Sequence, residues 1–343
     1  MNRKYFLRSL GLAGAGLATL PAVAGTHSDS ELQAVMPPYL KTGDTIAITS
    51  PAGDITEAEI QPAKLKLIEW GFKVRLGYSV GKRDFSFGGT DEERAKDLQI
   101  LMDDPGVKAI LCARGGYGIT RIIDKLSFTR FREKPKWVIG FSDISAFHIH
   151  LSKNYNIASV HSKMCNSFPE KWDTAEPEVQ ESLLSIKQLI TGNNMKYQVA
   201  PLPYNRKGIA NGQLIGGNLS IIQHLMGTNS EIRTDGKILF LEEVGEYLYS
   251  LDRMMVNMKR AKKLDHLAGL IIGGFNRIKP DDANEEFGRT LEEIVMDKVS
   301  AWKYPVCFGF PVGHQKYNVA LKNGAMHTLT VREDTVELTE KKS

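Results

Sequence analysis

The chain has 343 residues, of which 42% are hydrophobic and 24% are charged, and its formal net charge is +4. Because one core seldom serves more than about 250–300 residues, this length favours two domains. Three cationic and no acidic residues lie in 1–24, so the rest of the chain carries only +1 and its charge gives no support to nucleic-acid binding.

Residues 1–24 are predicted to be a signal peptide that takes no part in the fold. Arg3, Lys4 and Arg8 precede the apolar run LGLAGAGLATLPAVAG, which contains an A-x-A cleavage pattern. The opening NRKYFLRSL resembles a twin-arginine signal with Lys4 at the second arginine, so the Tat and Sec routes both stay open. No later segment has about 18 uninterrupted apolar residues. We expect an exported, periplasmic protein without a stable membrane span; a retained N-terminal anchor is the alternative.

Residues 38–166 are predicted to form an α/β domain with a mainly parallel sheet, because strand-like runs alternate with helical stretches. Helices are expected near 62–71, after Thr90, where Glu93 completes a capping box, and after Ser142. The apolar runs of this domain are TIAITS (45–50), KVRLGY (73–78), KAILCA (108–113), RIIDKL (121–126), KWVIG (136–140) and IASVH (157–161).

Residues 167–207 are polar and contain proline, so they are predicted to be a linker region with one helix at 179–190. Residues 208–343 are predicted to form a second, mixed α/β domain with helices near 251–262 and 290–301. Its strand-like runs include KILFLEE (237–243), AGLIIGGF (268–275), PVCFGFPVGH (305–314), MHTLTV (326–331) and TVELTE (335–340).

Three of these apolar runs end at residues that are capable of chemistry, namely Ser142, Glu242 with Glu243, and His314. Ligands bind beyond the carboxyl ends of strands in open α/β sheets, so such residues can converge. A serine nucleophile needs a base, and the base needs an acid that orients it. The motif G-F-S-D-I lacks the glycine that usually follows a nucleophile two residues on, so a helix N-cap role for Ser142 stays open beside the nucleophile role.

The stretch ARGGYG is a second candidate turn, with glycines at 115, 116 and 118. Its spacing is not G-x-G-x-x-G, which argues against a dinucleotide site. Such a turn can bring the backbone N–H of Gly116 to a substrate carbonyl, or it can be a packing turn without chemistry. Arg114 is predicted to hold a substrate carboxylate, with an ion pair that fixes the turn as the alternative. The histidines show no metal-ligand spacing, so no metal site is expected, and His161 is expected to be a packed or surface residue.

Six motifs in this order resemble the LD-carboxypeptidase family of serine peptidases, which includes muramoyltetrapeptide carboxypeptidases and microcin C immunity hydrolases. They are ITSPAG, ARGGYG, IGFSDIS, GQLIGGNLS, ILFLEEVGEYLYSLDRM and GFPVGH. The resemblance extends from about Thr45 to Val331. One departure is His161-Ser162-Lys163-Met164, where the family commonly has H-G-P-M, and it affects local contacts with the substrate.

The resemblance implies an N-terminal domain that carries the nucleophile and a C-terminal domain that carries the acid and the base. By motif, the nucleophile is Ser142, the acid is Glu242, the base is His314, and the backbone N–H groups of Gly116 and Asp143 form the oxyanion hole. The implied enzyme removes a terminal D-alanine from peptidoglycan stem tetrapeptides through an acyl-enzyme, needs no cofactor and is a homodimer.

Two alternatives to that activity stay open. The chain can hydrolyse another amide, such as a peptidyl-nucleotide of the microcin kind, or it can be a non-catalytic protein that binds cell-wall peptides. The intact Ser, Glu and His weigh against the second. Because adjacent strand residues point to opposite faces, Glu243 is expected to point away from the site or into solvent, as a surface carboxylate would.

Overall fold

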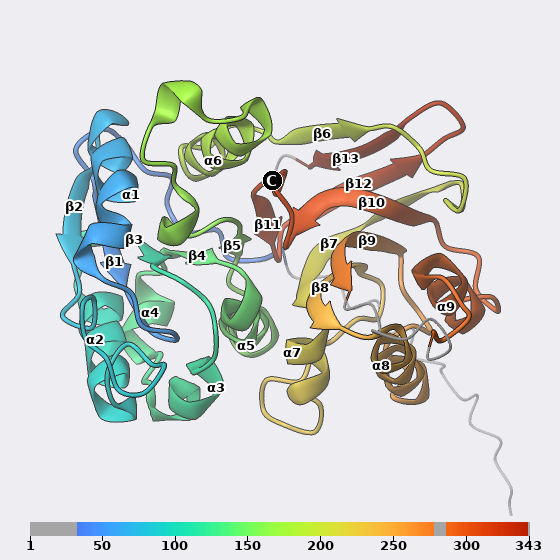
Figure 1. Cartoon of the computed structure of the whole chain (residues 1–343), viewed down its shortest axis with the longest axis horizontal. Coiled ribbons are helices and arrows are strands. Elements are labelled where there is room, and N and C mark those ends of the chain that lie inside the picture. The colour runs from blue at the N-terminus through green and yellow to red at the C-terminus, as the bar shows by residue number, and fades with distance from the viewer. Residues whose placement is uncertain (1–32, 278–285, 342–343) are drawn as a thin grey trace, which may run out of the picture. The chain divides into compact units, whose positions relative to one another are not determined.

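The computed structural model describes residues 33–277 and 286–341, so the predicted signal peptide lies outside the described residues. The described residues belong to one compact unit that begins at Gln33 and contains two β-sheets (Figure 1). Within the described ranges, no helix combines the length and the apolar character needed to cross a bilayer.

The first sheet has six strands in the order β11-β5-β4-β3-β1-β2. All neighbours are parallel except β11, which runs antiparallel to β5. This arrangement confirms the predicted α/β class with a mainly parallel sheet. The strands are β1 (Thr45–Thr49), β2 (Lys73–Leu76), β3 (Val107–Cys112), β4 (Trp137–Gly140), β5 (Ser159–His161) and β11 (Leu321–Asn323).

Helices cover both faces of this sheet (Figure 1). Because neighbouring strand residues alternate in direction, Ile46 and Ile48 face one apolar cluster with α1 and α6, while Ala47 faces the other with α2 and α5. Capping boxes at Thr56 and Thr90 start α1 and α2, so α1 begins upstream of the predicted 62–71. The helices are α1 (Glu57–Glu69), α2 (Asp91–Asp103), α3 (Ile119–Ile122), α4 (Thr129–Glu133), α5 (Ser145–Tyr155) and α6 (Pro177–Ile190), with short 3₁₀ turns η1 (Ile123–Lys125), η2 (Ser142–Ile144), η3 (Cys165–Ser167) and η4 (Trp172–Thr174).

The second sheet has seven strands in the order β10-β9-β8-β7-β12-β13-β6. The first four are parallel to one another, and β12, β13 and β6 continue the sheet in antiparallel fashion, which confirms the predicted mixed α/β part. The strands are β6 (Lys196–Val199), β7 (Gly208–Asn218), β8 (Ile238–Glu246), β9 (Gly269–Arg277), β10 (Val306–Gly313), β12 (Met326–Val331) and β13 (Val336–Glu340).

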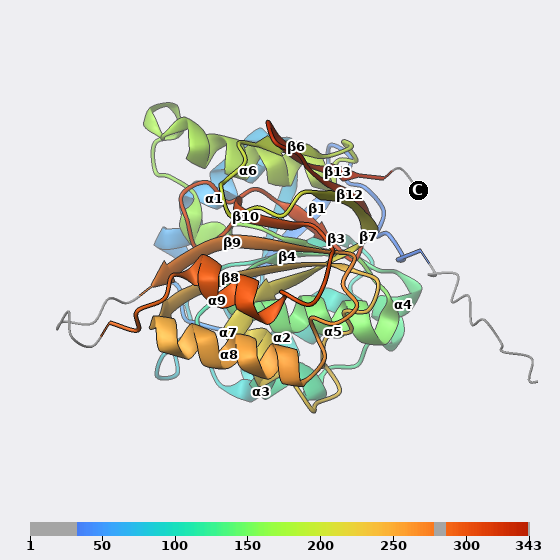
Figure 2. The same cartoon turned by 90° about the vertical axis from the view of Figure 1, so that its right-hand side faces the viewer.

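Three helices accompany the second sheet: α7 (Leu219–His224), α8 (Leu248–Arg260) and α9 (Leu291–Lys298). Figure 2 shows α8 and α9 side by side against β8 and β9. Their apolar side chains belong to the same buried cluster as Phe147 of α5 and Ile215 of β7. One apolar core therefore joins the part of the protein around the first sheet to the part around the second.

The predicted linker region contributes ordered elements to both sheets. Helix α6 packs its buried leucines and isoleucines into the core of the first sheet, and β6 forms the edge of the second. In the opposite direction, β11 comes from the C-terminal part and pairs with β5 of the first sheet. The predicted boundaries at 166 and 208 stay a prediction.

Candidate active site

Ser142 lies in a tight turn between β4 and α5. Its φ angle is +63°, in the left-handed region, which costs a residue with a Cβ atom about 1–2 kcal/mol. Neither η2 nor α5 has a side-chain cap, so the N-cap role for Ser142 is wrong. Backbone strain of this kind clusters at functional sites. Here the strained residue carries a hydroxyl group at the end of a buried strand.

The glycine turn packs directly against Ser142. A Cβ atom built on Gly115 would lie 3.0 Å from the Cβ and 3.2 Å from the Oγ of Ser142, so a larger residue would crowd the serine. Gly116 follows with φ +99°, and among the described residues its N–H has no acceptor. The fully buried Arg94 fixes the turn, because its guanidinium donates to the carbonyl of Gly118 at 3.0 Å and to that of Pro51 at 2.7 Å.

Asp143 links the serine turn to the glycine turn. Its Oδ2 accepts a hydrogen bond of 2.9 Å from the backbone N–H of Ile119, which follows the glycine turn. Burial raises the pKa of this carboxyl group to about 6, although hydrogen bonds from Ile119 and Gly118 oppose the increase. The backbone N–H groups of Asp143 and Gly116 therefore belong to two turns that are tied together beside Ser142.

Glu242 and His314 form a hydrogen bond, with 2.6 Å between Oε2 of Glu242 and Nδ1 of His314. Glu242 lies on β8 and is fully buried, whereas His314 follows the end of β10 and its side chain is 19% exposed. The approach requires glycine at 313, where a Cβ atom would lie 2.3 Å from the Cβ of Glu242. One nitrogen of the imidazole is thus hydrogen-bonded to a buried carboxylate.

Glu243 points away from His314, but the expectation of a surface carboxylate is wrong, because Glu243 is 2% exposed. Its Oε1 accepts from Nδ2 of Asn218 at 2.9 Å, and its Oε2 accepts from the backbone N–H of Ser220 at 2.6 Å. Asn218 is the N-cap of α7. Burial raises the pKa of Glu243. Its two hydrogen bonds connect the end of β7 and the start of α7 to β8.

The structure brings the serine turn and the histidine together through Phe141, whose ring centroid lies 4.8 Å from that of His314. No hydrogen bond joins the Oγ of Ser142 to His314 within the described residues. Hydrogen bonds between a nucleophile and its base are often long without substrate and shorten in the Michaelis complex. The geometry can therefore support nucleophilic catalysis by a serine with a histidine base.

His161 is a further residue at this site. From the sequence we expected only a packed or surface residue and did not predict its place beside Glu242. It is fully buried, and its Nε2 lies 3.8 Å from Oε1 of Glu242, beyond hydrogen-bond distance. Burial alone would raise the pKa of Glu242, yet His161 and His314 together hold that pKa below its usual value. His161 ends β5, so the strand-end signal that selected the other three residues also applied to it.

Arg114 lies next to the glycine turn and is partly buried. Its Nη1 donates a 3.1 Å hydrogen bond to the backbone carbonyl of Asp54, on the neighbouring loop. This contact is with a backbone carbonyl, and no ion pair of Arg114 of the kind that the alternative invoked is found among the described residues. Its role towards a substrate stays a prediction.

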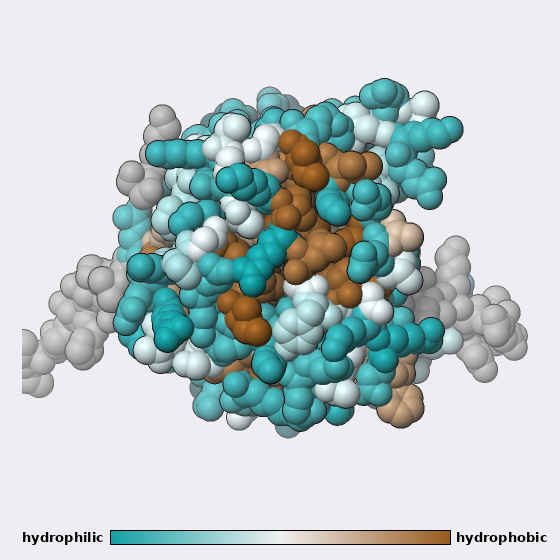
Figure 3. Space-filling view, turned by 90° about the vertical axis from the view of Figure 1, so that its left-hand side faces the viewer, coloured by the Kyte–Doolittle hydropathy of each residue, from teal (hydrophilic) through white to brown (hydrophobic). Residues whose placement is uncertain are grey.

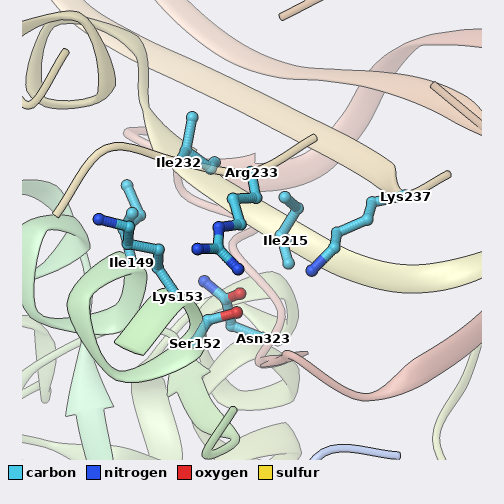
Figure 4. A pocket seen from close by; sticks show the side chains of 8 residues that line it. All are labelled: Ile149, Ser152, Lys153, Ile215, Ile232, Arg233, Lys237 and Asn323. Carbon is cyan, nitrogen blue, oxygen red and sulfur yellow. The ribbon is translucent and has the colours of Figure 1, made fainter. Parts of the chain in front are cut away.

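Figure 4 shows a small pocket that is lined in part by α5 and β7. Ile149, Ser152 and Lys153 of α5 and Ile215 of β7 are among its lining residues, and none of the predicted site residues is. In the described parts of the chain, no three His, Cys, Asp or Glu side chains gather in a way that could hold a metal ion.

Known proteins are similar to this chain in both sequence and fold. The LD-carboxypeptidase N-terminal domain matches residues 46–162, and the LD-carboxypeptidase C-terminal domain matches residues 211–329. A probable murein peptide carboxypeptidase of Bacillus subtilis is 33% identical over 302 residues, which cover 87% of this chain and 92% of that protein. The murein tetrapeptide carboxypeptidase of Pseudomonas aeruginosa is 30% identical over 288 residues, covering 81% and 91%.

Solved structures give the same result for the fold. The muramoyltetrapeptide carboxypeptidase from Oxalobacter formigenes has a TM-score of 0.78 and 27% identity, and the match covers 87% of this chain and 99% of that chain. MccF in complex with glutamyl sulfamoyl guanosine also has a TM-score of 0.78, at 21% identity over 89% of this chain and 98% of that one, and supports the fold alone. The predicted resemblance is confirmed: the chain belongs to the LD-carboxypeptidase family and is a serine carboxypeptidase.

Proposed function

We propose that the protein removes the terminal D-alanine from peptidoglycan stem tetrapeptides, with Ser142 as nucleophile, His314 as base and Glu242 as the acid that orients the base. The observation that carries the proposal is the buried Glu242–His314 hydrogen bond beside the strained serine turn. The substrate class comes from the relatives in Bacillus subtilis and Pseudomonas aeruginosa, whose names specify murein peptides.

In this mechanism the Oγ of Ser142 attacks the carbonyl carbon of the terminal amide while His314 takes the serine proton. Glu242 holds the imidazole through Nδ1, so Nε2 is the nitrogen that exchanges protons, and the buried carboxylate stabilises the imidazolium. His314 then gives the proton to the leaving amine. Water, activated by the same histidine, releases the acyl-enzyme.

The negative oxygen of the tetrahedral intermediate needs donors that are already in place. We assign this role to the backbone N–H groups of Gly116 and Asp143. The contact between Gly115 and Ser142 and the Asp143–Ile119 hydrogen bond support the assignment, because they fix both turns around the hydroxyl group. Arg94 makes the glycine turn rigid through its hydrogen bond to the carbonyl of Gly118.

The test is mass analysis of purified muropeptides before and after incubation with the protein. We expect loss of one alanine from tetrapeptides and no loss from tripeptides. Ser142→Ala should abolish the reaction, whereas Ser300→Ala, at an exposed serine at the end of α9, should retain it. Unchanged tetrapeptides with folded wild-type protein would contradict the proposal.

A second candidate is hydrolysis of a peptidyl-nucleotide, which the fold shared with MccF supports. The same assay separates the two, because a glutamyl or aspartyl nucleotide substrate replaces the muropeptide. Turnover of the nucleotide alone would select this alternative. Equal binding of muropeptide by wild-type and Ser142→Ala protein, without turnover of either substrate, would favour the hypothesis of a non-catalytic binding protein.

We further propose export to the periplasm through a signal in residues 1–24. The basic start, the apolar run and Ala22-Val23-Ala24 support this localisation. N-terminal sequencing of protein from the native envelope should find a chain that begins after residue 24. A chain that begins at Met1 would contradict cleavage.

We also propose a homodimer. Figure 3 shows apolar side chains gathered on the face that carries α1 and β2, and α1 exposes Leu65 and Ile68 by 57% and 49%. Contiguous apolar surface of this kind often marks a protein interface. Light scattering should give twice the mass of one chain, and Leu65→Glu with Ile68→Glu should reduce it to one. A monomeric wild type would exclude the dimer.

A further inference from the structure

Lys163 is a partly buried cation that has no carboxylate partner among the described residues. Its Nζ donates to the backbone carbonyl oxygen of Gln315 at 3.2 Å, and this is its one hydrogen bond within the described parts of the chain. An ammonium group has three donors, so two are left without a protein acceptor there. Desolvation lowers the pKa of Lys163, which shows that the protein stabilises this charge poorly.

The fully buried lysines of the described residues have partners for their charge or their donors. Lys322 pairs with Glu340, and Lys298 forms a 2.7 Å ion pair with Asp252. Lys136, which has no ion pair, donates to three backbone carbonyl oxygens. Burying a charge without such partners is unfavourable, so Lys163 differs from the lysines that serve the fold.

Lys163 belongs to a segment that contacts the candidate site. The preceding Ser162 donates its backbone N–H to Gly140, at the end of the strand that leads to Ser142, with 3.0 Å between the atoms. The following Met164 has its Cε 3.4 Å from the ideal Cβ position of Gly115. The ammonium itself is placed by its hydrogen bond to Gln315, which directly follows His314. It therefore lies beside the segment that carries the candidate base.

We propose that Lys163 binds the free carboxylate of the residue that the enzyme releases. This inference rests on the proposed function, since the residue that a carboxypeptidase releases carries the terminal carboxylate of the peptide. That carboxylate must come to rest close to the nucleophile, where a cation with unused donors stabilises it. The guanidinium of Arg114 already contacts Asp54 and is the competing donor.

In this role Lys163 determines specificity for a charged C-terminus and is not a member of the proposed triad.

The experiment compares a tetrapeptide with a free terminal carboxylate and the same tetrapeptide with a terminal amide. For each, kcat and KM are measured in wild type, Lys163→Met, Arg114→Met and Lys316→Met. Lys316 is the matched control, because it neighbours Gln315 in sequence but is 69% exposed and pairs with Glu176. Circular dichroism and thermal unfolding check the folding of each variant, and Lys163→Gln replaces Lys163→Met if the latter is unfolded.

We expect Lys163→Met to lower kcat/KM for the free acid by about 10–100-fold, mainly through KM, and to leave the amide much less affected. The preference for the acid over the amide should therefore collapse in this variant and persist in Lys316→Met. Lys163→Arg should retain most of the preference, because it keeps the charge.

Three results would overturn the proposal. An unchanged preference in Lys163→Met would exclude carboxylate binding, and a collapse in Arg114→Met alone would assign it to Arg114. An equal fall on both substrates would mean that Lys163 acts only through Gln315 on the position of His314.

Calorimetry with Ser142→Ala protein separates this inference from the proposed function. If wild type fails to cleave the tetrapeptide, the proposed function fails, while binding of the acid can still be compared with and without Lys163→Met. Weaker binding of the acid but not of the amide supports the inference even then. Equal binding, or no binding of either peptide, overturns it.

Discussion

Replacing Glu242 by glutamine tests the centre of the proposed site. The 2.6 Å contact joins a buried carboxylate to the Nδ1–H of His314, so the carboxylate fixes the tautomer and opposes the positive charge that forms on the ring. Glutamine has nearly the same shape but no charge, and its amide can face the imidazole with either the oxygen or the nitrogen. We expect kcat to fall by about 10³–10⁴-fold, equivalent to about 4–5.5 kcal/mol of transition-state stabilisation.

Glu243→Gln is the matched control, because the change is chemically identical at the adjacent residue. Its carboxylate accepts from Asn218, Ser220 and Val244, and an amide nitrogen in place of one oxygen would face a backbone donor. We expect a loss of about 1–3 kcal/mol in the free energy of unfolding. The folded fraction should keep kcat within about tenfold, because Glu243 does not contact the imidazole.

The assay is muropeptide turnover at a pH near 7.5, together with urea unfolding of both variants. The expected pattern is a loss of activity with Glu242→Gln and a loss of stability with Glu243→Gln. Near-normal turnover in Glu242→Gln beside a collapse in Glu243→Gln would exchange the two roles. Near-normal turnover in both would remove the acid from the mechanism.

Three further substitutions test the supports of the site. Arg94→Met should lower the free energy of unfolding by about 3–5 kcal/mol, measured by urea titration, because its guanidinium joins three turns. Burial raises the pKa of Asp143 from 3.8 to about 6. The contribution of this group to the free energy of unfolding is therefore full below about pH 4 and is lost as pH rises through about 6, a loss of about 3 kcal/mol. Asp143→Asn should remove this loss when unfolding is compared at pH 4 and pH 8. His161→Phe removes a group that favours the Glu242 carboxylate, so the acid limb of the pH profile of kcat/KM should shift to higher pH, whereas a purely structural role would leave the profile in place.

Much of the fold follows from local signals in the sequence. The strand-like runs around Ala47, Ile110 and Val138 form β1, β3 and β4, because runs that are apolar on both faces suit a parallel sheet covered by helices. The capping box at Thr90 sets the start of α2 as predicted. These features depend on neighbours along the chain, so a single sequence contains them.

Other features depend on partners that are distant in the chain. Strand β11 is too short to have a pattern of its own and exists because Leu321 and Asn323 pair with β5. Strand β6 likewise lies in a segment that reads as a linker and forms at the edge of β13. The burial of Glu243 could not be predicted either, because its partners Asn218 and Ser220 come from the end of another strand.

The site shows the same division between local and distant causes. That Ser142, Glu242 and His314 end strands is visible in the sequence, and the carboxyl ends of parallel strands bring such residues to one edge. The direction of each side chain, however, depends on contacts across the fold. Glu242 reaches His314 because Gly313 lets the strands approach, and His161 reaches Glu242 because β5 ends opposite Gly140.

The strained backbone at Ser142 is surrounded by contacts with both parts of the fold. A residue with φ +63° persists only where surrounding contacts hold it. The loop with Gly115, which follows β3, packs against Ser142, and the hydroxyl of Ser145, three residues further on, accepts the backbone N–H of Asn218, at the end of β7, at 3.0 Å. The same packing places Phe141 against the ring of His314. The segment that carries the candidate nucleophile therefore contacts elements of both sheets, including the residue of the candidate base.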